Sequence, residues 1–155
     1  MANYTAQDVK RLREETGAGM LDCKKALDEA NGNFEEAKEV VRQRGLALAE
    51  KKSDRETNEG YIACYVHATN KVAAMVEILC ETDFVARNDE FQAMARDVAL
   101  HVVAMNSETV EALLAEPFVK DPSKTVEELV KGVSGKIGEK FVVNRFVRYE
   151  VGESK

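Results

Sequence analysis

The chain has 155 residues, of which 45% are apolar and 32% are charged, and its formal net charge is -6. This size and composition allow one hydrophobic core with a small satellite domain, and they exclude a disordered or fibrous protein. The acidic balance argues against a general nucleic-acid binder, because phosphate binding requires a basic surface. No segment approaches membrane-spanning length and the N-terminus has no apolar leader, so we expect a cytoplasmic protein that does not bind membranes.

Residues 4–44 predict three short helices. Thr5 precedes the first helix, with Asp8 three residues later at capping-box spacing, and the Gly17-Ala18-Gly19 stretch ends it. A turn at residues 31–33 separates the second and third helices, and Gly45 is expected to end the third. Both of these helices carry an apolar stripe at helical spacing, which indicates a small shared core; the stripes are Met20, Cys23, Ala26, Leu27 and Ala30, then Phe34, Ala37, Val40 and Val41.

The chain is predicted to divide near Lys51. Residues 51–59 are nearly all polar and have no apolar period, which is typical of an exposed linker. We therefore expect one domain at residues 1–50, a linker at 51–59 and a second domain at 60–155.

The second domain begins with a predicted antiparallel hairpin, residues 61–67 and 72–80. If Thr69 and Asn70 form its tip, Cys64 lies opposite Met75 and Cys80 lies on the other face of the sheet. Residues 141–151 alternate between apolar and polar side chains and predict a third strand.

Helices are predicted to cover this sheet. Residues 88–105 form a long amphipathic helix with Asn88 as its N-cap. Shorter helices are expected at 109–115 and 126–133, the latter with a capping box formed by Thr125 and Glu128. Pro117 and Pro122 bracket the loop between them, which can be neither regular helix nor central strand. The expected class is α+β, with helices on one face of a small antiparallel sheet.

The segment Thr82-Asp83-Phe84-Val85 is the most informative in the chain. It follows the apolar strand 72–80, and Thr82 and Asp83 are residue types that hold turns and helix starts. Phe84 would thus be carried on a fixed corner. Two interpretations are open from the pattern alone: Asp83 is a cap and Phe84 belongs to the core, or the corner presents Phe84 to a partner.

A covalent enzyme is the weaker alternative. Such an enzyme would use Cys80 beside Asp83 with His67 or His101 as a base, but the strand pattern points Cys80 into the sheet core. The chain has three cysteines, which are Cys80, Cys23 and Cys64, and no two of them have C-x-x-C spacing. We therefore expect reduced thiols and no disulfide. The two histidines lie far apart in sequence and give no metal site, and His101 is expected near the core; no cofactor is predicted.

Four motifs in order along nearly the whole chain carry a resemblance to a known family. They are TGAGMLDCKKAL at 16–27, TDFVARN at 82–88, PFV at 117–119 with PSKTV at 122–126, and FVRYEVGE at 146–153. Together they closely resemble the elongation factor Ts family. The loop at residues 17–20 also resembles the partner-reading loop of ubiquitin-associated domains.

The resemblance implies a fold and an activity. It implies an N-terminal three-helix ubiquitin-associated-like domain followed by an α+β core, and nucleotide exchange without covalent chemistry on the GTPase elongation factor Tu. By the same resemblance, Thr82, Asp83, Phe84 and Val85 would disturb the magnesium ion of the partner. Leu12, Gly19, Met20 and Lys24 are candidate contacts of the N-terminal domain, although Leu12 could equally be core and Lys24 could lie on a solvated face.

The chain is a short form of that family. Long members carry a duplicated core with an inserted helical hairpin and a C-terminal module, whereas here residues 117–151 follow the first core half almost directly. A single half-core would leave an open sheet, so we hypothesise a symmetric homodimer that supplies the second half. A binding module without exchange activity is the other alternative.

Overall fold

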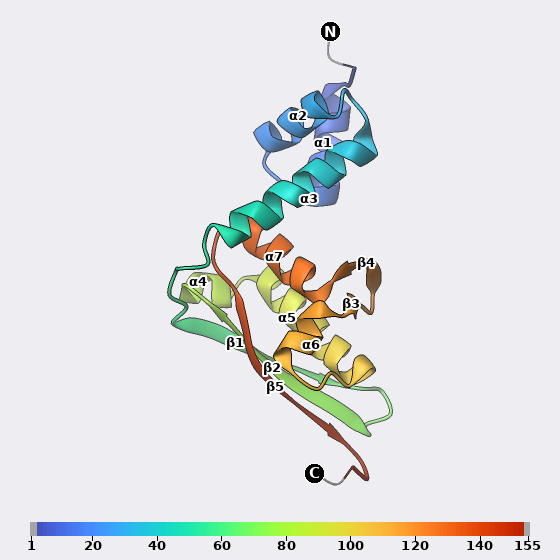
Figure 1. Cartoon of the computed structure of the whole chain (residues 1–155), viewed down its shortest axis with the longest axis vertical. Helices are drawn as coiled ribbons and strands as arrows, with labels where there is room; N and C mark the ends of the chain where they lie inside the picture. The colour runs from blue at the N-terminus through green and yellow to red at the C-terminus, as the bar shows by residue number, and fades with distance from the viewer. Residues whose placement is uncertain (1–2, 154–155) are drawn as a thin grey trace.

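The computed structural model describes residues 3–153, so the outermost residues of the two predicted domains, 1–2 and 154–155, lie outside the described part. Three helices at the N-terminal end stand above a mixed helix and sheet unit (Figure 1). They are α1 (Ala6–Thr16), α2 (Met20–Glu29) and α3 (Phe34–Glu50). The predicted capping box of Thr5 and Asp8 starts α1, and Gly17, at a φ of 69°, ends it. Both local predictions are confirmed.

The third helix is longer than predicted. It does not end at Gly45 but continues to Glu50. Gly45 lies inside this helix, where α7 (Val126–Ile137) approaches closely: a Cβ added to Gly135 of α7 would stand 2.3 Å from the Gly45 carbonyl oxygen. The absence of a side chain is required at Gly135, because a Cβ there would overlap the backbone of α3.

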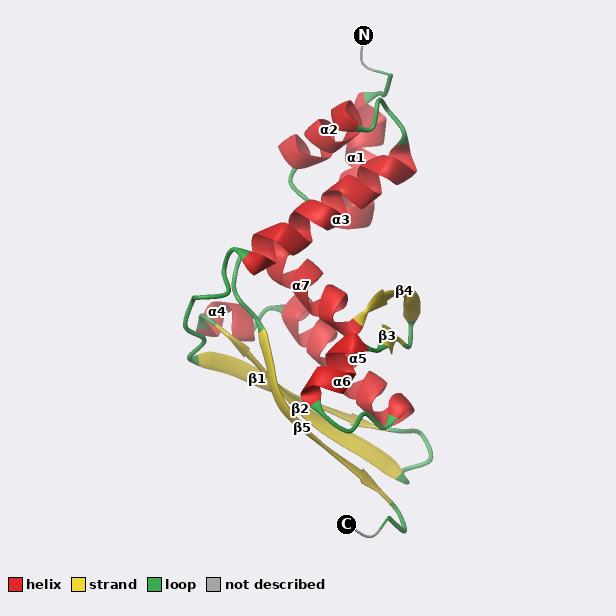
Figure 2. Cartoon of the chain, in the orientation of Figure 1, coloured by secondary structure: helices red, strands yellow, loops and turns green. Residues whose placement is uncertain are grey.

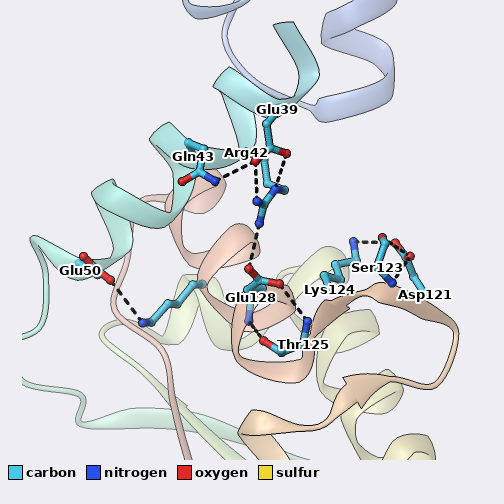
Figure 3. A network of polar contacts seen from close by, with 10 residues as sticks. Glu39, Arg42, Gln43, Glu50, Asp121, Ser123, Lys124, Thr125 and Glu128 are labelled. Carbon is cyan, nitrogen blue, oxygen red and sulfur yellow. Dashed lines mark hydrogen bonds and ion pairs between the residues drawn. The ribbon is translucent and has the colours of Figure 1, made fainter. Parts of the chain in front are cut away.

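Charged side chains flank this contact between α3 and α7. Arg42 of α3 holds Glu39 of its own helix and also donates from Nη1 to Glu128 Oε1 of α7 at 3.0 Å (Figure 3). One turn further on, Lys131 lies 3.6 Å from Glu50. The three-helix unit therefore packs against the rest of the chain through the contact between α3 and α7.

The segment after α3 is irregular, as its composition predicted, but it is not exposed throughout. Lys52 is buried, and burial lowers the pKa of its ammonium group. Lys140 Nζ donates to the carbonyl oxygen of Arg55, so this segment packs against the loop before the last strand. The division of the chain into two domains stays a prediction, although two separate hydrophobic clusters exist, one in the three-helix unit and one in the remainder.

The predicted strands form one antiparallel sheet in the order β1 (Glu59–Val66), β2 (Val72–Cys80) and β5 (Val142–Glu150). Cys64 pairs with Met75 and Cys80 faces the core, as the hairpin register predicted. The turn itself differs from the predicted two-residue tip, because the N–H of Asn70 donates to the carbonyl of His67 and so closes a turn over residues 67–70; Asn70 has a φ of 55°.

The helices lie on one face of this sheet (Figure 2). They are α4 (Asp83–Ala86), α5 (Asp89–Met105), α6 (Val110–Ala115) and α7. Asn88 caps α5, and Thr125 and Glu128 form the predicted capping box of α7, which runs one turn past its expected end. Between α6 and α7 the proline-bracketed loop forms a small hairpin, β3 (Pro117–Phe118) and β4 (Asp121–Thr125).

The core of this unit lies between α5 and the sheet. Phe91, Val98 and Val102 of α5 are fully buried with Val76 and Ile78 of β2. The predicted α+β class is confirmed. The likeness of the three-helix unit to ubiquitin-associated domains stays a prediction. Among residues 3–153, no helix combines the length and apolar character needed to cross a membrane.

His101 has the core position that the sequence predicted. Its side chain is fully buried, with Nε2 at 2.8 Å from Glu116 Oε2. Nδ1 accepts a hydrogen bond from the backbone N–H of Val119 at 3.1 Å. The imidazole therefore ties α5 to the small β3–β4 hairpin, and both of its nitrogens are occupied by structural contacts.

Candidate site at the corner after strand β2

The corner consists of Thr82 and the single helical turn α4. Thr82 has extended backbone angles and accepts a hydrogen bond from Val85 N–H through its hydroxyl, which makes it the N-cap of α4. Asp83 opens the turn, where a carboxylate is favoured by the exposed N–H groups. Asp83 Oδ2 also lies 3.0 Å from Arg87 Nη2.

The turn presents Phe84 to solvent. Phe84 is 81% exposed, more than any other large apolar side chain of residues 3–153, whereas Val85 packs against the core. The interpretation of Phe84 as a core residue is therefore wrong. The turn is capped by Thr82 and packed on the core through Val85, so it holds the exposed ring of Phe84 in place. This arrangement is expected of a residue that contacts a partner.

Glu139 forms hydrogen bonds to the start of the corner, and the sequence analysis did not identify it. Glu139 lies in the loop between α7 and β5, and its carboxylate accepts hydrogen bonds from the backbone N–H of Glu81 and Thr82. It also accepts the Thr82 hydroxyl at 2.6 Å. No local pattern could have revealed this contact, because the two segments are far apart in the chain.

A second group of exposed residues lies at the start of α2. Gly19 and Lys24 are exposed and Met20 is 47% exposed. Leu12 is fully buried in the core of the three-helix unit, so the structure supports the core alternative and removes Leu12 from the candidate contacts. Leu21, which the sequence analysis did not single out, is 73% exposed. The signal was present in the sequence, since Leu21 is an apolar residue on the polar face of α2.

The α1–α2 loop borders α7, and the corner is bonded to Glu139 in the loop that follows α7. A Cβ on Gly17 would overlap the end of the Lys136 side chain, so the loop lies directly against this residue. Lys136 Nζ in turn pairs with Glu90 Oε1 at 2.6 Å, on the first turn of α5. Lys136 thus joins the α1–α2 loop to the helix that follows the corner.

The thiol of Cys80, the candidate nucleophile of the enzyme alternative, is not activated. Cys80 is fully buried, its Sγ donates to the Thr82 carbonyl, and burial raises the pKa of its thiol to about 11. A thiol with that pKa is almost wholly protonated at neutral pH and is a poor nucleophile. Within residues 3–153 no three carboxylate, histidine or cysteine side chains gather as a metal site would require.

The fold is α+β and its corner exposes an aromatic ring, and comparison with known proteins identifies the family. A family model described as Elongation factor TS matches residues 81–155. The elongation factor Ts of Finegoldia magna is 42% identical over 206 aligned positions, covering 99% of this chain and 92% of the relative. That of Carboxydothermus hydrogenoformans is 40% identical, covering 96% of this chain and 89% of the relative. The chain belongs to the elongation factor Ts family, and hence to the translation elongation factors.

The alignments also show how this chain differs in length from its relatives. The alignment with the Finegoldia magna protein spans 206 positions, although this chain has 155 residues, so the relative carries internal segments without a counterpart here. The elongation factor Ts of Aquifex aeolicus is 48% identical over 149 positions, which cover 93% of this chain but 51% of the relative. These differences fit the prediction of a short form.

Proposed function

We propose that this chain is a guanine nucleotide exchange factor that binds elongation factor Tu with GDP and promotes GDP release. The observation that carries the proposal is the corner: Phe84 is 81% exposed on a turn that is capped by Thr82 and anchored by Val85. Family membership supports the choice of partner. The site of action is then the cytoplasm, where translation takes place.

The mechanism follows from how a GTPase holds GDP. The nucleotide is bound through backbone amides of the phosphate loop and through a magnesium ion on the β-phosphate, so loss of either contact weakens it sharply. Phe84 acts as an apolar wedge in a pocket near the phosphate loop of the partner, while Asp83 bonds to a polar group beside it. Thr82 and Val85 hold the turn in place. The insertion shifts the elements that place the magnesium ion, and no covalent step occurs.

The free energy available from the wedge can be bounded. Moving a phenylalanine side chain from solvent into an apolar pocket contributes about 1.5–3 kcal/mol. Since about 1.4 kcal/mol corresponds to a factor of ten, burial of Phe84 changes the ratio of partner states by roughly 10-fold to 100-fold. By linkage, GDP must weaken the binding of this chain by the same ratio as this chain weakens the binding of GDP. Nucleotide then displaces the factor and completes the cycle.

The three-helix unit supplies a second contact in this proposal. Gly19, Met20 and Lys24 dock on the nucleotide-binding domain of the partner away from the phosphates, and the exposed Leu21 extends the apolar part of the contact. This anchor holds the corner near the phosphate loop. Its loss should weaken complex formation more than it slows GDP release within the complex.

We also propose that a second copy of the chain covers the open face of the sheet. That face carries apolar side chains that are about half exposed or more, with Met75 in the central strand; the others are Ile62, Val66 and Tyr149. The relatives with additional internal segments support this, because such segments could cover the same surface within one chain. A two-fold symmetric contact between identical faces is the commonest way to bury such a surface.

Light scattering tests the homodimer. The parent chain should show the mass of a dimer, and Met75→Lys should show that of a monomer. Val119→Lys is the matched control, since Val119 is also an exposed apolar residue but lies outside the three-stranded sheet. A parent chain that is monomeric at the concentrations used for exchange would refute this proposal.

Exchange is tested by turnover. A small molar amount of the chain should accelerate release of fluorescent GDP from many elongation factor Tu molecules, whereas a passive binder would act only in equimolar amounts. Treatment of the monomeric Met75→Lys variant with an alkylating reagent at Cys64 should leave its exchange rate unchanged, because the proposed mechanism uses no thiol. Stoichiometric binding without accelerated release would leave a binding module as the function.

A further inference from the structure

The loop between α7 and β5 is bonded to the corner through the carboxylate of Glu139, a set of contacts called the grip below. Glu139 Oε1 accepts hydrogen bonds from the N–H groups of Glu81 and Thr82, both at 3.0 Å. Its other oxygen, Oε2, accepts the hydroxyl of Thr82 at 2.6 Å. A single ionised side chain thus holds three donors of the segment that leads into α4, and bonds to an ionised acceptor are about twice as strong as neutral ones.

The grip is reciprocal. Glu81 Oε1 accepts a hydrogen bond from the backbone N–H of Lys140 at 2.7 Å, and this bond lowers the pKa of the Glu81 carboxyl. Arg55 Nη1 lies at 3.3 Å both from Glu81 Oε1 and from the carbonyl oxygen of Gly138. The Glu139 carboxylate therefore binds the segment before α4, and the Glu81 carboxylate binds the loop between α7 and β5. Arg55, from the segment after α3, contacts both.

The position of Glu139 is itself fixed by the end of α7. Gly138 adopts a φ of 97°, which stops the helix and turns the chain toward the sheet. The buried hydroxyl of Ser134 donates to the carbonyl oxygen of Glu139. The backbone that carries the Glu139 carboxylate is thus anchored to the end of α7.

This contact determines how α4 is presented. The Thr82 hydroxyl has one proton, and it donates that proton to Glu139, so a lone pair of the same oxygen faces the N–H of Val85. Without the carboxylate, the hydroxyl would be free to rotate and the cap of a four-residue turn would loosen. Phe84 is the second residue of that turn, so its direction depends on the cap.

We propose that Glu139 is a positioning residue for nucleotide exchange, acting through Thr82 on Phe84. The inference rests on the proposed function, in which Phe84 is the wedge. Glu139 does not touch the partner in this account. It keeps the ring in the orientation that enters the pocket, and so it affects GDP release within the complex more than formation of the complex.

The exchange assay separates this role from a merely structural one. Misplacement of a functional group by about 1 Å costs up to about 100-fold in rate, so Glu139→Ala should lower the maximal GDP release rate by roughly 10-fold to 100-fold. The concentration of this chain that gives half-maximal release should change much less. Glu139→Gln keeps an acceptor for the two N–H groups and should lose about half as much on a logarithmic scale, since its bonds are neutral.

A double variant and a matched control complete the kinetic test. If Glu139 acts through Phe84, then Glu139→Ala combined with Phe84→Ala should release GDP no more slowly than Phe84→Ala alone. Asp121→Ala is the control, because Asp121 also accepts a backbone N–H and a hydroxyl from one residue, Ser123, but does so in the β3–β4 hairpin. A parental rate for Glu139→Ala, or full additivity with Phe84→Ala, would overturn the inference.

Hydrogen exchange distinguishes failure of this inference from failure of the proposed function. In Glu139→Ala, or in Glu139→Gln if the alanine variant does not fold, the amides of Glu81, Thr82 and Val85 should exchange faster than in the parent chain. Unchanged protection of these amides would refute the grip itself, whatever the exchange assay shows. No acceleration of GDP release by the parent chain would refute the proposed function, and with it the role of Glu139 in exchange.

Discussion

Replacing Gly135 by alanine should destabilise the protein relative to the same change at Gly132, one turn earlier on α7. Alanine is favoured over glycine inside a helix by about 1 kcal/mol, and this gain applies at both sites. At Gly132 a new Cβ meets nothing within 4 Å, so the variant should keep the full gain. At Gly135 the Cβ would stand 2.3 Å from the Gly45 carbonyl oxygen of α3, and overpacking of this kind costs about 1–3 kcal/mol.

Thermal unfolding followed by circular dichroism measures the difference. For a protein of this size a change of 1 kcal/mol shifts Tm by about 2–4 °C, so the two variants should differ by roughly 2–12 °C, with Gly132→Ala the more stable. Gly45→Ala is a further control, because its Cβ also meets nothing within 4 Å although Gly45 takes part in the same contact. Equal Tm values for the Gly132 and Gly135 variants would refute the close approach of α3 and α7.

Three further predictions concern buried, acidic and exposed groups. In the monomeric Met75→Lys variant, Cys64 should react with a thiol reagent at neutral pH, while Cys23 and Cys80 stay unlabelled because both are buried and their thiol pKa values are raised. Attachment of more than one label to the folded chain, measured by mass spectrometry, would contradict this. The lowered pKa of Glu81, caused mainly by the Lys140 N–H, contributes stability above its ordinary value of 4.5 that is lost as the pH falls through the folded value. In urea titrations below pH 4.5, the free energy of unfolding of Glu81→Gln should therefore depend less on pH than that of the parent chain. An unchanged pH dependence in this acidic range would argue against the hydrogen bond between Glu81 and the Lys140 N–H. Leu12→Ala should cost about 2–5 kcal/mol of stability, whereas Leu21→Ala should leave Tm unchanged and weaken binding to elongation factor Tu in a titration; the reverse pattern would exchange their assigned roles.

Local signals in the sequence predicted where α1, α5 and α7 begin. The capping boxes at Thr5 and Thr125 and the cap at Asn88 depend on residues within three positions of each other, so the sequence alone contains the whole interaction. The hairpin register was also predictable, since it follows from a short turn and the alternation of side chains.

Long-range contacts account for what the sequence could not predict. Gly45 carries the pattern of a helix end, yet α3 continues through it to Glu50 and packs there against Gly135 of α7, a contact between positions 90 residues apart. Lys52 lies in a polar stretch yet is buried. The grip of Glu139 on Thr82 joins β2 to the loop after α7, and one carboxylate among the 28 acidic residues gives no signal of such a role.

The candidate site was predictable in composition but not in orientation. Thr82 and Asp83 indicate a helix start after a strand, and the structure places them there. The outward direction of Phe84 could not be derived from the pattern, because an aromatic residue beside an apolar strand is equally compatible with the core. The burial of Leu12 likewise depends on how the three helices pack.

The most direct test of the account is the release rate of fluorescent GDP from elongation factor Tu with catalytic amounts of the parent chain, of Asp83→Ala and of Phe84→Ala. The account predicts strong acceleration by the parent chain and a loss of roughly 10-fold to 100-fold in the maximal rate for Phe84→Ala, with a smaller loss for Asp83→Ala. A Phe84→Ala variant that releases GDP as fast as the parent at equal occupancy of the partner would contradict the wedge.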